Sequence, residues 1–271
     1  MTRERTYILT AVSAALFLIL TWAFADGLFT GNLWNAEEIS SSAIFTYVFL
    51  ALILLAGWYQ ARQLPENGTV VEPPQRETVT GQVQDPIIWQ RLMGNAYWAI
   101  LWLSVRFFVG REWVAASEHK LRDPAWMDTG TALQGFWQRA VAVPEQGAPM
   151  ITYGWYRDVL QYMLDNQWYT WFAPIVAVGE LLVGLGLIFG ALVGIAAFFG
   201  TVMNFSFMMA GTASSNPVLF GLSVLLVLAW KTAGYWGLDR YLLPALGAPW
   251  KPGSLFEPRV EHTGRSDRAP A

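Results

Sequence analysis

Residues 97–135 read YWAILWLSVRFFVGREWVAASEHKLRDPAWMDTGTALQG, and this stretch decides the fold. It begins as an apolar run long enough to cross a bilayer, with Arg106 inside the run. It becomes polar at Glu118, His119 and Lys120, and it turns at Pro124. An arginine at the centre of a membrane helix costs about 2.5–3.5 kcal/mol on insertion scales, so we expect Arg106 to have a partner or a task.

The composition of the chain indicates a membrane protein. Of its 271 residues, 54% are hydrophobic and 14% are charged, whereas soluble domains carry about 25% charged residues. The chain has no Cys, which excludes disulfides, thiolate metal sites and iron–sulfur clusters within it. Two His leave little for haem or zinc, and a net charge of −3 gives no reason to expect nucleic acid. We therefore expect a lipid bilayer as partner and neither metal nor haem in this chain.

Six apolar runs predict an all-α polytopic membrane protein with six transmembrane helices. The predicted spans are 7–29, 43–59, 95–116, 169–189, 192–210 and 217–236. The polar, proline-bearing segment 63–90 predicts a linker. The chain is accordingly divided into two N-terminal helices (1–62), the cytoplasmic linker (63–90), a membrane domain (91–246) and a polar tail (247–271) for which we expect little order.

The glycines of the fourth and fifth runs follow a regular spacing. Gly186, Gly190 and Gly194 lie four residues apart, which is typical of close helix packing in membranes. The alternative is that they only ease the turn at 190–191.

Positive charge predicts the orientation of the spans. Arg3, Arg5, Arg62, Arg76 and Arg91 fall on one side. Lys120, Arg122, Arg139 and Arg157 fall on the other, in a long segment that has little weight in the positive-inside rule. The loop at 30–40 contains no Lys or Arg. The positive-inside rule therefore predicts a multi-pass protein of the plasma membrane with both termini cytoplasmic and residues 118–168 outside.

Within that outer segment, residues 153–168 form an amphipathic pattern. Trp155, Val159, Tyr162, Met163 and Trp168 fall roughly on one helical face. This pattern predicts either a helix that lies in the membrane interface or an ordinary helix that covers the end of the bundle.

Three polar residues are predicted to lie at comparable depths inside the bilayer. They are Arg106 in the third run, Glu180 in the fourth and Asn204 in the fifth. We expect Arg106 and Glu180 to pair, with Asn204 as a hydrogen-bonding neighbour, because a lone charge in hydrocarbon is far more costly. Such a group is either a catalytic site for a polar ligand head or an ion pair that only fixes helix register.

A second polar cluster follows at the outer end of the third run. Arg111, Glu112 and Lys120 are candidate ligand-binding residues there, together with Trp126 in the DPAW turn. His119 is a candidate catalytic proton donor or acceptor, since an unperturbed imidazole titrates near neutral pH. The alternative for His119 is an interfacial hydrogen-bonding role.

Four blocks of sequence resemble the DoxX/DoxD family. They occur in the family's order within residues 95–246, and they read RFFVG…EHKLRDPAWMDTGTALQGFW, GELLVGLGLIFG, MNFSFMMAGTASSNP and AWKTAGYWGLDRYLLP. The resemblance implies a four-helix membrane bundle formed by the last four spans, and the first two spans lie outside it.

DoxD-type members are the membrane subunit of thiosulfate:quinone oxidoreductase and act with a small DoxA subunit. The resemblance therefore implies oxidation of thiosulfate, diffusible quinone as the electron acceptor, and a DoxA-like partner. Other DoxX proteins are membrane partners in oxidative-stress complexes, so a non-enzymatic scaffold stays open. A homo-oligomer stays open as well.

Overall fold

The computed structural model describes residues 1–24, 41–64 and 85–248, and the regular structure within these ranges is entirely helical. The predicted linker at 63–90 and the predicted tail at 247–271 lie mostly outside the described residues. The helical structure of the described ranges confirms the predicted all-α fold class. Three helices are long and apolar enough to cross a membrane, namely Arg3–Phe24, Ile44–Gln63 and Tyr169–Phe189.

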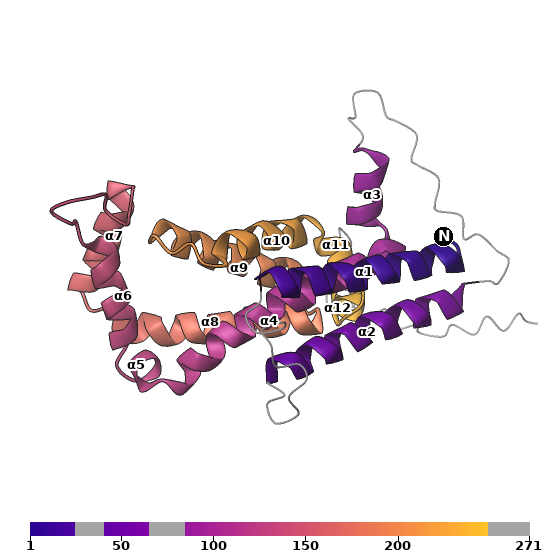
Figure 1. Cartoon of the computed structure of the whole chain (residues 1–271), viewed down its shortest axis with the longest axis horizontal. Coiled ribbons are helices and arrows are strands. Elements are labelled where there is room, and N and C mark those ends of the chain that lie inside the picture. The colour runs from indigo at the N-terminus through magenta and orange to yellow at the C-terminus, as the bar shows by residue number, and fades with distance from the viewer. Residues whose placement is uncertain (25–40, 65–84, 249–271) are drawn as a thin grey trace, which may run out of the picture.

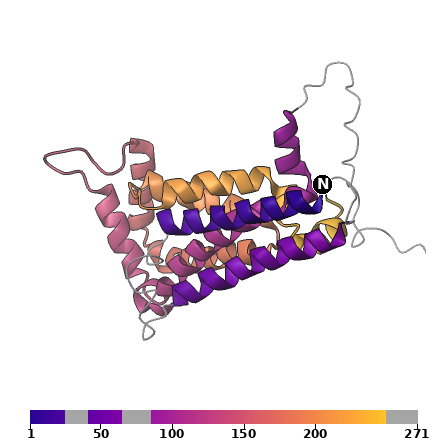
Figure 2. The same ribbon diagram turned by 45° about the vertical axis from the view of Figure 1, so that its right-hand side comes forward.

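Four helices form the central bundle. They are α4 (Ile100–Arg122), α8 (Tyr169–Phe189), α9 (Val193–Met209) and α10 (Asn216–Leu228). Their contacts form a ring, with α4 beside α8, α8 beside α9, α9 beside α10 and α10 beside α4. All four run along the long axis of the molecule (Figures 1 and 2).

The closest approach in the bundle is between α4 and α8. A Cβ atom on Gly110 would lie 3.0 Å from the carbonyl oxygen of Gly184, and one on Gly184 would lie 2.9 Å from that of Gly110. Neither position has room for a methyl group, so two glycines allow the backbones to meet. This contact sets the register of the antiparallel pair.

A helical hairpin covers one side of the bundle. Its two helices, α1 (Arg3–Phe24) and α2 (Ser41–Gln63), pack on each other and on α4. The Ser13 hydroxyl donates to the carbonyl of Ile100 at 2.7 Å, and the Ser104 hydroxyl donates to the carbonyl of Ser13 at 2.5 Å. These two bonds attach α1 to α4.

Short helices lie at the two ends of the bundle (Figure 1). What we call the α7 end carries α5 (Pro124–Met127), α6 (Thr131–Val141) and α7 (Gly154–Asp165). What we call the α3 end carries α3 (Ile87–Gly94), the 3₁₀ turn η1 (Ala96–Trp98), α11 (Trp230–Ala233) and α12 (Asp239–Leu246).

Among the differences between the helices and the predicted spans, two concern the site. Helix α4 continues to Arg122 instead of ending near residue 116, and Asp123 then caps α5 by accepting from the Ala125 N–H at 2.9 Å. The sixth predicted span is divided, since α10 ends at Leu228 and α11 begins at Trp230. In contrast, α8 has the predicted bounds, Tyr169–Phe189.

The regularly spaced glycines do not form one packing ridge. Gly186 lies against Ala196 of α9, and Gly194 lies against Trp230. Gly190 has a φ of +67°, which favours glycine, and it ends α8 beside the Arg106 guanidinium. Each glycine therefore has a separate local role.

Candidate functional site

Arg106 is fully buried and donates four hydrogen bonds to backbone carbonyl oxygens. Its Nε bonds to the carbonyl of Leu187 at 2.8 Å, and its Nη2 bonds to that of Ile188 at 3.0 Å. Its Nη1 donates to the carbonyls of Ala233 at 2.9 Å and Trp236 at 3.3 Å. The guanidinium thus joins the end of α8 to the segment around α11.

These carbonyls explain why an arginine occupies this position. The last turn of a helix leaves carbonyl oxygens without intrahelical partners, and its partial negative charge favours a cation. Leu187 and Ile188 belong to the last turn of α8, and Ala233 is the last residue of α11. Arg106 therefore caps two helix ends, the end of α8 and the end of the short helix α11.

The predicted pair between Arg106 and Glu180 is wrong. Gly110 lies beside Gly184 in an antiparallel helix pair, so Glu180 faces the level of residue 114 and not that of Arg106. Eight residues of helix separate these levels, which corresponds to about 12 Å. The prediction counted depth from the expected ends of the spans, and that count cannot supply the register between two helices.

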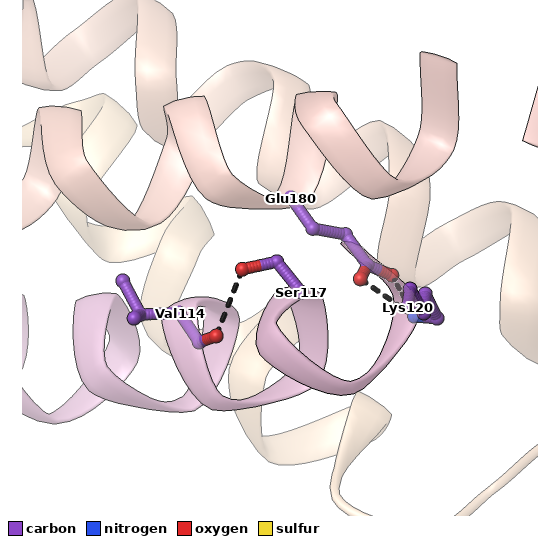
Figure 3. Close-up of polar contacts among 4 residues, drawn as sticks. All are labelled: Val114, Ser117, Lys120 and Glu180. Atoms are coloured by element: carbon purple, nitrogen blue, oxygen red, sulfur yellow. Dashed lines mark hydrogen bonds and ion pairs between the residues drawn. The ribbon is translucent and has the colours of Figure 1, made fainter. Parts of the chain in front are cut away.

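Glu180 pairs instead with Lys120 (Figure 3). The Lys120 Nζ lies 2.5 Å from Oε1 and 2.6 Å from Oε2 of Glu180, so the ammonium contacts both carboxylate oxygens. The Glu180 side chain is 1% exposed and the Lys120 side chain is 21% exposed. The carboxylate is therefore inside the protein, and the ammonium joins it to a more open space.

Lys120 reaches Glu180 because it lies on the buried face of α4. Arg106, Gly110, Trp113, Ser117 and Lys120 follow one another at alternating spacings of four and three residues, and all but Lys120 are buried. Residues at this spacing share one helical face. The sequence contained this signal, but the predicted helix ended before Lys120 and left it outside the face.

A cavity of about 1160 Å³ lies where the α7 end joins the bundle. Side chains of α2, α4, α5, α6, α8, α9 and α10 line it. It includes every predicted site residue except Arg106, namely Arg111, Glu112, His119, Lys120, Trp126, Glu180 and Asn204. Two polar groups that the sequence suggested separately, near Glu180 and near Lys120, therefore belong to one site.

Asn204 is the polar group in the cavity that most clearly lacks a partner. Its side chain is fully buried on α9, and neither its Oδ1 nor its Nδ2 has a hydrogen-bond partner in the described part of the chain. The Nε1 of Trp113, also on the cavity wall, is buried and unpaired among the same residues. Buried polar groups are nearly always hydrogen-bonded, so these unpaired groups beside the cavity are candidates for ligand bonds, which a small rearrangement of the wall would have to uncover.

Aromatic rings surround the ammonium group of Lys120. Its Nζ lies 5.1 Å from the centre of the Trp126 ring and 5.9 Å from that of Phe207. A cation within about 6 Å of an aromatic face is stabilised by the ring electrons. Lys120 is thus held in place by a carboxylate and two rings, on the cavity wall that also carries Asn204.

The cavity rim is charged and more accessible. Arg111 pairs with Glu112 at 3.0 Å, and Arg122 pairs with Glu118 at 2.8 Å. His119 is exposed and also lines the cavity. The arrangement suits a ligand with a polar, flat head and an apolar remainder.

Within residues 1–24, 41–64 and 85–248, no group of three or more His, Cys, Asp or Glu could hold a metal ion. The binding groups of the site are thus an amide, an ion pair and aromatic rings.

No family model matches the chain, and neither a curated protein nor a solved structure matches it.

Proposed function

We propose that this chain is the membrane subunit of a quinone-linked oxidoreductase of the thiosulfate:quinone oxidoreductase type. Two independent lines support the proposal. The first is the resemblance of four ordered blocks in residues 95–246 to DoxD-type proteins. The second is a cavity in which the unpaired amide of Asn204 accompanies the Lys120–Glu180 ion pair.

The amide of Asn204 is the observation that carries the proposal. A buried carboxamide with a free donor and a free acceptor matches both forms of a quinone, whose oxygen accepts a hydrogen bond when oxidised and donates one when reduced. Trp126 and Phe207 provide flat apolar surfaces beside it. The amide and the two aromatic side chains therefore suit a flat ligand ring that carries polar groups at its edge.

The proposed reaction balances without any redox group in the chain. Two thiosulfate ions lose one electron each as the central S–S bond of tetrathionate forms. The quinone gains both electrons and takes up two protons to become the quinol. Lys120 is the proposed proton donor at the quinone oxygen, and His119 at the rim is the proposed route from solvent to Lys120.

The proposed topology has six spans in the plasma membrane, with both termini in the cytoplasm. Helix α8 is apolar and long enough to cross a bilayer, α4 and α9 pack against it, and α10 packs against α4 and α9. The charges of α4 that would be costly in lipid face the protein, as Arg106 and Arg111 are both buried. A small DoxA-like subunit is the proposed partner at the α7 end.

A non-enzymatic membrane scaffold is the alternative function. It is favoured by one observation, namely that Arg106 is sealed among carbonyl groups and takes no part in the cavity. A scaffold, however, needs no cavity with unpaired amide groups, so the enzyme is the preferred proposal.

The test is thiosulfate-dependent quinone reduction by membranes that contain the chain, with and without a small partner subunit. We expect activity in at least one arm and a loss of at least about a hundredfold in Lys120→Met, since general acid catalysis contributes about 10²–10⁴ in rate. Lys231→Met is the matched control, because Lys231 is exposed near the α3 end and lies outside this cavity. Folded wild-type protein without activity in either arm would rule out the enzyme and leave the scaffold.

A further inference from the structure

The N-terminal hairpin lies outside the segment that resembles the DoxX/DoxD family, yet it contributes to the cavity. Phe45 and Phe49 of α2 line the same space as Asn204 and Lys120. Residues separated by a long stretch of sequence thus form one site, and the two added helices are part of it.

The two phenylalanines differ in how they are held. Phe49 is 4% exposed and stacks on Phe107 of α4, with ring centres 4.6 Å apart, and the Phe17 ring meets its edge at 6.3 Å. Phe45 lies 6.0 Å from Phe49 and is 49% exposed. Phe49 therefore anchors the wall, and Phe45 forms its outer edge.

Phe45 connects the cavity to the apolar surface of the molecule. Helix α2 is one of the three helices long and apolar enough to cross a membrane, and Tyr47 and Leu55 on it are more than half exposed. A cavity that ends at a half-exposed residue of such a helix reaches the surface that lipid would cover. The polar wall formed by Asn204 and Lys120 belongs to the bundle helices α9 and α4, not to the hairpin.

The hairpin is attached to the bundle by hydrogen bonds and by ring contacts. Gln60 donates to the carbonyl of Tyr97 at 3.0 Å, and the Ser13 hydroxyl donates to that of Ile100 at 2.7 Å. Phe49 stacks on Phe107, and the Phe24 ring lies 6.5 Å from that of Phe108. Non-directional ring contacts allow the cavity wall to adjust to an apolar ligand, while the hydrogen bonds hold the hairpin to the bundle.

We propose that Phe45 and Phe49 form the contact surface for the apolar side chain of the bound quinone. The ring then lies against Asn204 and Lys120, and the side chain leaves the cavity past Phe45 into the membrane. This inference rests on the proposed quinone function, and it assigns the two added helices a role in selecting ligands with an apolar side chain.

The test measures binding of two quinones to the purified full-length chain in lipid nanodiscs by thermal shift and by titration. One probe is dimethoxy-methyl-benzoquinone without a side chain, and the other is the same ring with a decyl chain. We expect Phe45→Ala to weaken binding of the decyl quinone about tenfold, the effect of losing contact with roughly two methylene groups. Binding of the ring without a side chain should stay unchanged.

Tyr47→Ala is the matched control, since Tyr47 is 56% exposed on the same helix and does not line the cavity. It should leave the affinity for both probes at the wild-type value. Phe49→Leu is a second variant that keeps an apolar side chain at the buried anchor, and it should also affect only the decyl quinone.

The possible results separate the two proposals. An unchanged affinity for the decyl quinone in folded Phe45→Ala and Phe49→Leu, or an equal loss for both probes, would overturn the role of the hairpin while the quinone site stands. If the wild-type chain binds neither probe, the proposed function fails and this inference fails with it.

Discussion

Arg106 and Lys120 lie on the same face of α4, but their charges are stabilised in different ways. Arg106 donates to carbonyl groups, most of them at helix ends, where partial negative charges replace water, and the Asp239 carboxylate attracts it without a direct hydrogen bond. Lys120 faces a formal negative charge, the carboxylate of Glu180, beside a cavity. The guanidinium of Arg106 is therefore enclosed by protein, whereas the ammonium of Lys120 lies within reach of a ligand in the cavity.

A double-mutant cycle tests the Lys120–Glu180 pair. Removing Lys120 alone leaves a buried carboxylate without its cation, which costs about 3–5 kcal/mol of unfolding free energy. Removing Glu180 as well relieves part of this loss, so we expect Lys120→Met and Glu180→Leu to be non-additive by about 1–3 kcal/mol. The free energies are measured by unfolding in mixed micelles.

Arg106→Ala with Glu180→Leu provides the comparison for this cycle. Because the two side chains have no common partner and lie about 12 Å apart along the bundle, their effects should add within about 0.5 kcal/mol. Strong coupling there, with none between Lys120 and Glu180, would mean that the described register of α4 and α8 is incorrect.

Arg106→Lys tests whether the guanidinium is needed for its shape or only for its charge. A lysine keeps the charge but cannot direct bonds to four carbonyls on two helix ends. Each buried carbonyl left unpaired costs about 1–3 kcal/mol, so thermal stability in detergent should fall markedly. The dissociation constant for quinone should stay near wild type, because Arg106 lies outside the cavity; a selective loss of binding would contradict its structural role.

The residues of the site were largely predictable, but their pairing was not. The apolar runs contain or adjoin three polar residues, Asn204, Glu180 and Lys120. Polar side chains are unfavourable in a membrane, so their positions in the sequence already mark them as candidates. The pairing depends on the register between α4 and α8, which Gly110 and Gly184 set by close contact. That register is a property of packing in space, and the sequence of neither helix contains it.

At the scale of the elements, α7 presents apolar residues on two sides. Leu160 is buried against α6 and its neighbours, whereas Trp155, Val159 and Tyr162 are between 47% and 61% exposed. Tyr162 lies 5.8 Å from Trp168, which lies 5.5 Å from Trp171 on the exposed surface of α8. The uncovered strip of α7 thus continues into the apolar surface of a membrane-length helix.

This continuity favours the prediction that α7 lies in the membrane interface while it also covers the end of the bundle. The natural chain has no Cys, so single cysteines can report on it without interference. We expect Val159→Cys to react slowly with a water-soluble maleimide in lipid vesicles and Asp158→Cys to react fast. The two positions are adjacent in sequence, and Asp158 is exposed on the polar side of α7.

Equal labelling of Val159→Cys and Asp158→Cys in intact vesicles would show that the apolar strip faces water. Detergent denaturation should make both cysteines fully reactive, which controls for their chemistry.

The elements show where sequence patterns predict helix ends well and where they do not. The bounds of α8 follow from a clean apolar run closed by Gly190. The end of α4 was missed because residues 118–122, EHKLR, are polar and were not counted in the apolar run. They nevertheless continue the helix, and Lys120 is held there by its ion pair with Glu180. The break at Ala229 has no Gly or Pro at that position to announce it, and Arg106 binds the carbonyl of Ala233 at the end of the short helix that follows.

Across the whole molecule, the two ends of the bundle differ in their organisation. The α3 end contains the four bonds of Arg106, and the Asp239 carboxylate accepts from the N–H groups of Leu192 and Val193 at 2.6 and 2.9 Å. The α7 end contains the cavity with the unpaired amide of Asn204. The charged groups at the α3 end are thus bonded to the backbone, whereas the charged pair Lys120–Glu180 at the α7 end lines the cavity.

Because the cavity lies at one end of the bundle, the orientation of the chain decides on which side of the membrane a donor reaches it. Cysteine labelling in intact cells can test this orientation. The proposed topology, with both termini cytoplasmic, predicts that the α7 end and its cavity rim face the outside, where the proposed donor thiosulfate would reach them. We expect Gln146→Cys, in the exposed segment between α6 and α7, to react with a membrane-impermeant maleimide on intact cells. Asp85→Cys, exposed before α3, should react only after permeabilisation. The opposite pattern would invert the chain and place the cavity rim in the cytoplasm, so that the proposed electron donor would have to be an internal one.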